Sequence, residues 1–88
     1  MESDSIQARI EHETAELHAL YPHIEKCQTA LVHWTDPQGS HYSLGLDIRW
    51  PQHQRLVSGE AKDNPTAAIA AAFAAARERV REAAWASR

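Results

Sequence analysis

The sequence predicts an α+β domain with the element order α-β-β-β-α, a three-stranded antiparallel sheet and both helices on one face of the sheet. Three observations support this fold class. An amphipathic helical segment precedes Pro22, three strand-like runs follow at about 27–34, 41–50 and 54–60, and an alanine-rich helical segment closes the chain. The 88 residues are expected to form one domain, 1–88, near the lower size limit for a self-sufficient core.

The first helix is expected to begin near Asp4, which can cap it, with Gln7 in the position that a capping box requires. Its apolar side chains recur at helical spacing and should face the core: Ile6, Ile10, Leu17, Leu20 and Tyr21. Glu13 falls on the same arc, so it must reach the edge of the core or find a partner. Pro22 ends the helix, because its ring removes a hydrogen-bond donor and restricts the preceding residue.

The second strand has the clearest pattern of the three. Its apolar residues alternate with polar or small ones and should face the helices: Tyr42, Leu44, Leu46, Ile48 and Trp50. The turn before it is 36–39, Asp-Pro-Gln-Gly, and Pro51 stops it. The first strand, Cys27 to Trp34, is mixed on both faces, whereas the third, at 56–59, is short and fits an edge.

The last helix is expected to open at Asn64-Pro65, a polar cap followed by proline at the first helical position. The residues that should face the sheet are Ile69, Ala72, Phe73, Ala76 and Val80. Arg77, Arg81 and Arg88 fall along one side of the helix and would form a cationic ridge. The alternative is an ordinary solvated helix face, on which Glu78 pairs with Arg81 and Arg79 with Glu82.

Charge and composition limit the possible functions. The net charge is −3, which argues against a strongly basic nucleic-acid binder. Residues 1–25 hold six Asp or Glu against one Arg, net −5, so any anion-binding surface should lie in 26–88. Cys27 is the only cysteine, which excludes an intramolecular disulfide and favours a reducing compartment. With no signal-like or membrane-spanning segment, we expect a cytoplasmic protein without membrane contact.

Catalytic and metal-binding chemistry have little support in the sequence. It has no nucleophile elbow and no phosphate-binding glycine loop, so we expect neither an enzyme nor a cofactor. His33 and His41 flank the predicted turn and could approach each other. One cysteine and no carboxylate at matching spacing leave such a site short of ligands, so we expect no metal.

Several segments together resemble a known family. They are Ile6-Gln7-Ala8-Arg9-Ile10, Leu17, Leu20-Tyr21, Ile24 and Cys27, then a hairpin, Leu56-Val57-Ser58-Gly59 and Thr66-Ala67-Ala68-Ile69 before a helix that ends in arginines. This combination is similar to the ribosome hibernation promoting factors, also described as ribosome-associated inhibitors or sigma-54 modulation proteins. The resemblance implies a β-α-β-β-β-α fold like that of double-stranded-RNA-binding domains. It also implies a cytoplasmic stress-response factor that binds in the mRNA/tRNA channel of the small ribosomal subunit and inhibits translation.

The resemblance also implies candidate rRNA-binding residues. Arg77, Arg81 and Arg88 match the basic end of the family's last helix, and Lys26 and Lys62 match its basic loops. Contact with rRNA phosphates is the chemistry expected of them. The competing interpretation is a protein-interaction or dimerisation module of the same fold that has lost rRNA binding. It is suggested by the acidic residues of the first helix, which is commonly basic in the family: Glu11, Glu13 and Glu16.

One element of the family pattern lacks a counterpart in this sequence. In the family a strand precedes the helix that begins near Asp4, whereas only Met1, Glu2 and Ser3 stand before it here, too few for a strand across the sheet. The strand at Cys27–Trp34 would then have one unpaired edge. We expect the same edge of a second copy to cover it in a homodimer.

Overall fold

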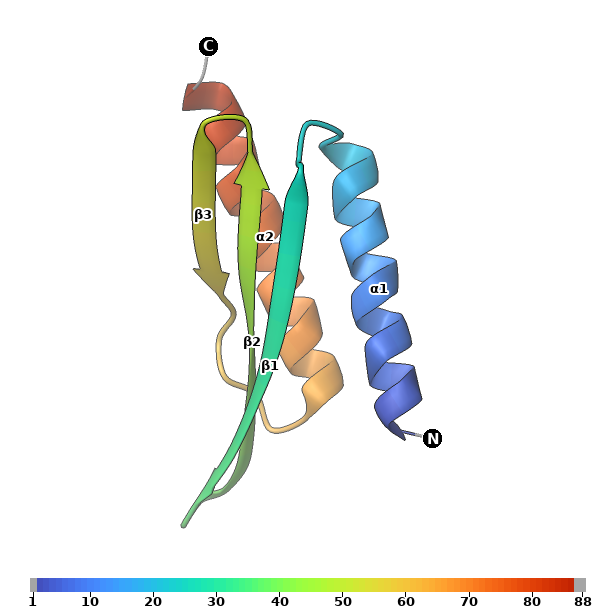
Figure 1. Ribbon diagram of the computed structural model, residues 1–88. Helices are drawn as coiled ribbons and strands as arrows, with labels where there is room; N and C mark the ends of the chain where they lie inside the picture. The colour runs from blue at the N-terminus through green and yellow to red at the C-terminus, as the bar shows by residue number, and fades with distance from the viewer. Residues whose placement is uncertain (1, 87–88) are drawn as a thin grey trace.

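The computed structural model describes residues 2–86, and the side chains of residues 5–82 among them. The elements are α1 (Glu2–Leu20), β1 (Lys26–Asp36), β2 (Gly39–Trp50), β3 (His53–Ser58) and α2 (Pro65–Ala86). The strands form one antiparallel sheet in the order β1-β2-β3. The predicted α+β class and the order α-β-β-β-α are therefore confirmed (Figure 1).

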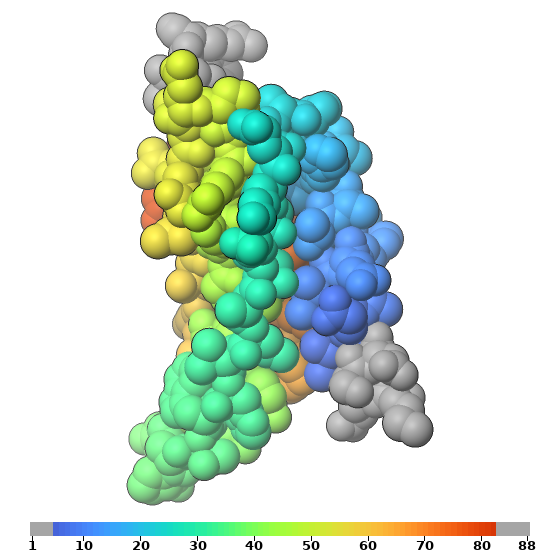
Figure 2. Space-filling model, in the orientation of Figure 1, coloured from blue at the N-terminus to red at the C-terminus, as the bar shows by residue number. Residues whose placement is uncertain are grey.

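The two helices form a layer on one face of the sheet. In Figure 1 both run in the same direction, α2 behind the middle of the sheet and α1 beyond the side of β1 that faces away from β2. The far end of the β1–β2 hairpin extends past both helices as a free arm (Figure 2). The opposite face of the sheet is open, as the sequence pattern predicts.

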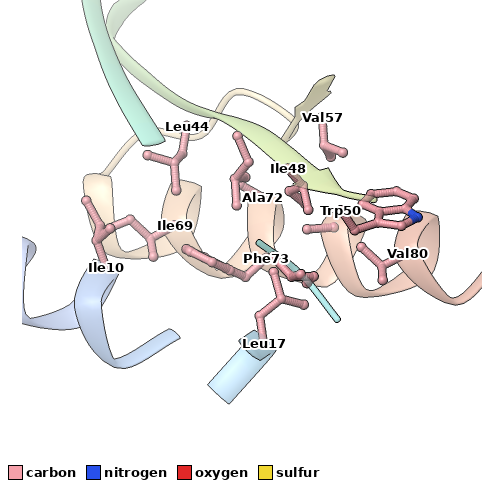
Figure 3. Packing of buried hydrophobic residues seen from close by; sticks show 13 residues of the cluster. Ile10, Leu17, Leu44, Ile48, Trp50, Val57, Ile69, Ala72, Phe73 and Val80 are labelled. Carbon is pink, nitrogen blue, oxygen red and sulfur yellow. The ribbon is translucent and has the colours of Figure 1, made fainter. Parts of the chain in front are cut away.

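The core lies between β2 and α2, with α1 closing one side. Figure 3 shows Phe73 of α2 between Leu17 of α1 and Ile48 of β2. The buried side chains of β2 are Leu44, Leu46, Ile48 and Trp50, and those expected on α2 are all fully buried: Ile69, Ala72, Phe73, Ala76 and Val80. The predicted strand register is therefore correct, because a shift by one residue would have placed the polar residues inside.

Three of the four residues that marked helix ends in the sequence are confirmed in that role: Pro22, Asn64 and Pro65. Asn64 caps α2, since its Oδ1 accepts the backbone N–H of Ala67 at 2.8 Å, and Pro65 is the first helical residue. α1 ends at Leu20, just before Pro22. The expected cap at Asp4 is wrong, because α1 already begins at Glu2 and the backbone at Asp4 is helical.

Four apolar residues expected in the core are not fully buried. Ile6 and Tyr21 are half-buried and pack against it, whereas Leu20 and Tyr42 lie outside it. Leu20 is 62% exposed, because it lies at the margin of the apolar stripe and is the last residue of α1. Tyr42 is only half-buried and does not join the core cluster. Its ring stacks on His33 instead, with the ring centroids 4.3 Å apart.

The register of the hairpin keeps apart His33 and His41, the two histidines that the sequence suggested could approach each other. His33 lies opposite Tyr42, whereas His41 lies opposite Trp34. Side chains one position apart in register point to opposite faces of a sheet, so the two imidazoles do not converge. His41 Nε2 instead lies 2.9 Å from Asp36 Oδ1, and its ring stacks on Trp34.

Within residues 2–86, no helix is long and apolar enough to cross a membrane.

Candidate functional site

Arg77 is held between the two helices. Its Nη2 donates a hydrogen bond of 2.8 Å to Glu13 Oε2 and lies 3.7 Å from Glu16 Oε2. Glu13 is the carboxylate on the apolar arc of α1 that needed a partner, and its side chain is only 16% exposed. The charge of Arg77 is therefore already compensated, and the residue ties α1 to α2.

Arg81 lies one turn further along α2 and has a more exposed environment. Its Nη2 donates to Glu78 Oε1 at 2.7 Å, and Arg79 Nη1 lies 3.6 Å from Glu82 Oε2. Both pairs that the sequence predicted for a solvated face are thus present. The Arg81 side chain is 60% exposed, and an ion pair so exposed adds little stability, so a phosphate could replace the carboxylate. Arg88 lies outside the described residues.

The two candidate lysines lie at opposite ends of the sheet. Lys26 is the first residue of β1 and pairs in register with Arg49. Lys62 lies beside Tyr42, with which it exchanges two backbone hydrogen bonds, and its Nζ is 3.3 Å from Glu60 Oε2. The candidate residues that the structure describes are therefore not brought together, because Arg77 and Arg81 are on the helix layer and the lysines are at separate ends.

Lys26 has two polar neighbours that sequence reasoning did not assign to a site. The register places Lys26, Arg49 and Gln54 in one row across the three strands. Asp47 accepts hydrogen bonds from Gln54 (2.9 Å) and Arg49 (3.2 Å). The hydrogen bond from Gln54 is the main cause that holds the pKa of Asp47 below its usual range, and Arg49 adds to it. Strand alternation put Arg49 on the polar face, but only the register shows its neighbours.

A groove of about 410 Å³ separates α1 from the free side of β1. Apolar side chains of Ile10, Leu17 and Ile24 contribute to its lining, together with Cys27 and Thr29 of β1. Burial, and secondarily the negative charge of Asp47, raise the pKa of the Cys27 thiol. The thiol is thus protonated near neutral pH and is suited to its expected role as a small apolar group.

The open face of the sheet carries apolar side chains that nothing covers within the described residues. Val32 is 53% exposed, Trp34 40% and Leu56 77%. A shallow hollow beside Leu56 is also lined by Gly45 and by the two residues that pair with it in register, Ala30 and Ser58. Such uncovered apolar groups beside a free strand edge are typical of a surface that meets a partner.

The surfaces open to a partner are therefore the exposed end of α2, the row that begins at Lys26, the groove beside β1 and the open sheet face. We compared the chain with models of protein families, with curated proteins and with solved structures. None of the three comparisons finds a match.

Proposed function

We propose that this domain is a ribosome-associated protein that binds rRNA of the small subunit and inhibits translation under stress. One observation carries the proposal: α2 holds Arg81 outside the core, in an ion pair exposed enough to be exchanged for a phosphate. A guanidinium offers two parallel donors to phosphate oxygens. The α-β-β-β-α arrangement, which the resemblance to hibernation factors implies apart from one strand, supports the same function.

The geometry divides the candidate residues by role. Among the candidates that the structure describes, Arg81 and Lys26 are the cations available to rRNA. Arg88, outside the described residues, stays a candidate through the resemblance alone. Arg77 acts in positioning, because Glu13 and Glu16 of α1 already compensate its charge. Lys62 is half-buried beside Glu60 and contributes less. The activity proposed is binding in the cytoplasm, without catalysis or a cofactor.

The experiment is co-sedimentation of the protein with purified small ribosomal subunits over a series of salt concentrations. Wild-type protein should bind at low salt and dissociate as salt rises. The double variant Arg81→Gln/Arg88→Gln should lower the slope of log affinity against log salt by about one unit for each lost phosphate contact. Arg77→Gln is the matched control and should keep the wild-type slope at a temperature where it is folded. Wild-type protein that never binds, or a double variant with an unchanged slope, would remove this function.

The second candidate function is a protein-interaction module of the same fold. It is favoured by the acidic surface of α1, where Glu11 borders the groove and forms no ion pair with the described side chains. An rRNA backbone near this helix would meet like charge. Binding by such a module would depend less steeply on salt than rRNA binding does, because apolar and backbone contacts would supply most of its affinity and no phosphates would be involved.

A further inference from the structure

The backbone pairing of β2 shows which residues of β1 face its free edge. Tyr42 exchanges backbone hydrogen bonds of 2.7 and 2.8 Å with Lys62, and the carbonyl of Leu44 accepts the N–H of Gly59 at 3.1 Å. The β2 residues that make these bonds, Tyr42 and Leu44, are even-numbered, so the backbone groups of even-numbered residues of β2 point toward β3. Since the N–H and C=O of one residue in an antiparallel strand point to the same side, the odd-numbered residues of β2 bond toward β1.

In β1 the assignment follows from the register. The carbonyl of Arg49 accepts a bond of 2.7 Å from Glu25, on the β1 side as expected, and Arg49 pairs with Lys26. The even-numbered residues of β1 therefore bond to β2. The N–H and C=O groups of Cys27, Thr29 and Leu31 consequently point to the free edge. No other strand of residues 2–86 pairs with that edge, and an unpaired strand edge is a template for another strand.

The groove beside this edge has the shape of a missing strand. On the α1 side it is lined by a regular helical stripe of Gln7, Glu11, Thr14 and His18. From Gln7 to His18 the helix rises about 16 Å at 1.5 Å per residue, the length of about five residues of a strand. Thr29 points to the helix side and lines the groove, yet it stays only half-buried.

The charges around the groove select a basic occupant. Glu11 and Glu25 both line it. The ion pairs of the described side chains engage Glu13 and Glu16 but neither of these two. Lys26 also lines the groove, but its side chain projects to the open face, because Cys27 next to it faces the helices. An occupant with lysine or arginine near Glu11 and Glu25 would gain two favourable contacts.

The position of α1 disfavours a second copy as the occupant. Two copies paired through the same antiparallel edge would be related by a two-fold axis normal to the sheet. Such an axis keeps both α1 helices on the same side of the joined sheet. Because α1 lies beyond the edge of β1 (Figure 1), the partner's helix would then lie over β1 and β2, in the space that α2 fills. A single extended segment carries no helix, so it fits beside β1 without this overlap.

We propose that the groove between α1 and β1 binds a basic, extended segment of a partner protein as an added strand beside Cys27, Thr29 and Leu31. Every second side chain of the segment points into the groove. Apolar side chains in this set cover the apolar lining, and cationic ones in the same set lie near Glu11 and Glu25. Main-chain hydrogen bonds supply affinity and the alternate pockets supply selectivity, as in other cases of strand addition. The proposal does not rest on rRNA binding, which the small-subunit assay tests separately.

The experiment measures amide hydrogen exchange of the full chain by NMR. The probe is a capped peptide in which lysine and valine share the alternate positions that face the groove, and serine occupies the positions between them. The free protein should show fast exchange at Cys27, Thr29 and Leu31 and slow exchange at Gln28 and Ala30. Saturating peptide should slow the three edge amides by about tenfold or more. The matched peptide of glutamate and valine should not protect them, and Glu11→Lys should weaken lysine-peptide binding by about fivefold.

Two further controls separate strand addition from other contacts. Thr29→Pro removes an edge N–H that β2 does not use and should abolish protection of Cys27 and Leu31. If that variant does not fold, the lysine–valine peptide N-methylated at its groove-facing lysine and valine residues, whose N–H groups point to β1 in an antiparallel pairing, serves the same purpose with wild-type protein. Absence of protection at saturating peptide, equal binding of the glutamate peptide, or full binding of the N-methylated peptide would each overturn the proposal. Edge amides that are protected without peptide, in proportion to protein concentration, would show that a second copy fills the groove instead.

Discussion

Arg77, one of the candidate rRNA-binding residues, ties the two helices together through Glu13. Arg77→Gln should lower the free energy of unfolding by about 1–2 kcal/mol, because it leaves the largely buried carboxylate of Glu13 without its cation. Arg79→Gln breaks only an exposed pair with Glu82 and should change stability by less than about 0.5 kcal/mol. Urea denaturation of both variants tests this, and equal midpoints would contradict the positioning role of Arg77.

Leu46 is the single residue that best tests the core. It is buried on the helix side of β2, next to Val57 in the register of β3. Leu46→Ala should destabilise the domain by about 2–5 kcal/mol through lost transfer energy and the cavity left behind. In a domain of 88 residues this is a large share of the total stability. Thermal denaturation followed by circular dichroism measures it, and a shift of only a degree or two would mean that the site is loosely packed.

Among the elements, the contact between the end of β3 and α2 depends on a glycine. A Cβ added at Gly59 would lie 2.6 Å from both Cα and N of Ala72, so backbone would have to move. Gly59→Ala should therefore cost about 1–3 kcal/mol, as overpacking does in other cores. Gly45→Ala is the matched control in the same sheet, because its nearest neighbour would be 3.9 Å away. Comparable melting temperatures for the two variants would show that α2 can move away from residue 59 without a loss of stability.

The β1–β2 hairpin is the element whose order should depend on pH. The hydrogen bond from His41, followed by that from the backbone of Gln38, lowers the pKa of Asp36. Because the folded pKa lies below the unfolded value of about 3.9, the stabilisation is complete above that value and is lost as pH falls through the folded pKa. Acid titration by NMR should show the turn residues 36–39 losing order before the core does. Asp36→Asn should remove this pH dependence, and an unchanged titration would contradict it.

At the scale of the whole molecule, charge is divided between the first helix and the rest of the chain. Residues 1–25 are net −5, from six acids and one arginine, and α1 presents Glu11 on its exposed surface. If this face approaches rRNA, Glu11→Lys should strengthen binding to small subunits by more than Glu11→Gln does, because it replaces repulsion by attraction. Filter binding at low salt measures both variants. Unchanged affinity in both would place α1 away from the rRNA.

Local patterns were sufficient to predict most of the fold. The alternation from Tyr42 to Trp50 identified the buried face of β2, since side chains on a strand alternate between the two faces. Pro22 and Asn64-Pro65 marked helix ends, because proline and caps act on the turn beside them. The predicted cap at Asp4 was wrong because such signals are local: a residue that is suited to cap a helix can equally lie within the first turn of one.

The sequence by itself thus determined the element order, the buried faces and the ion pairs within α2, all of which depend on residues close together in the chain. Only the tertiary structure decided that Arg77 pairs with Glu13, that Lys26 lies beside Arg49, and that a groove separates α1 from β1. These features depend on how helices pack and how strands align over long sequence separations. Periodicity specifies which face of an element is buried, but not which residue of another element it meets.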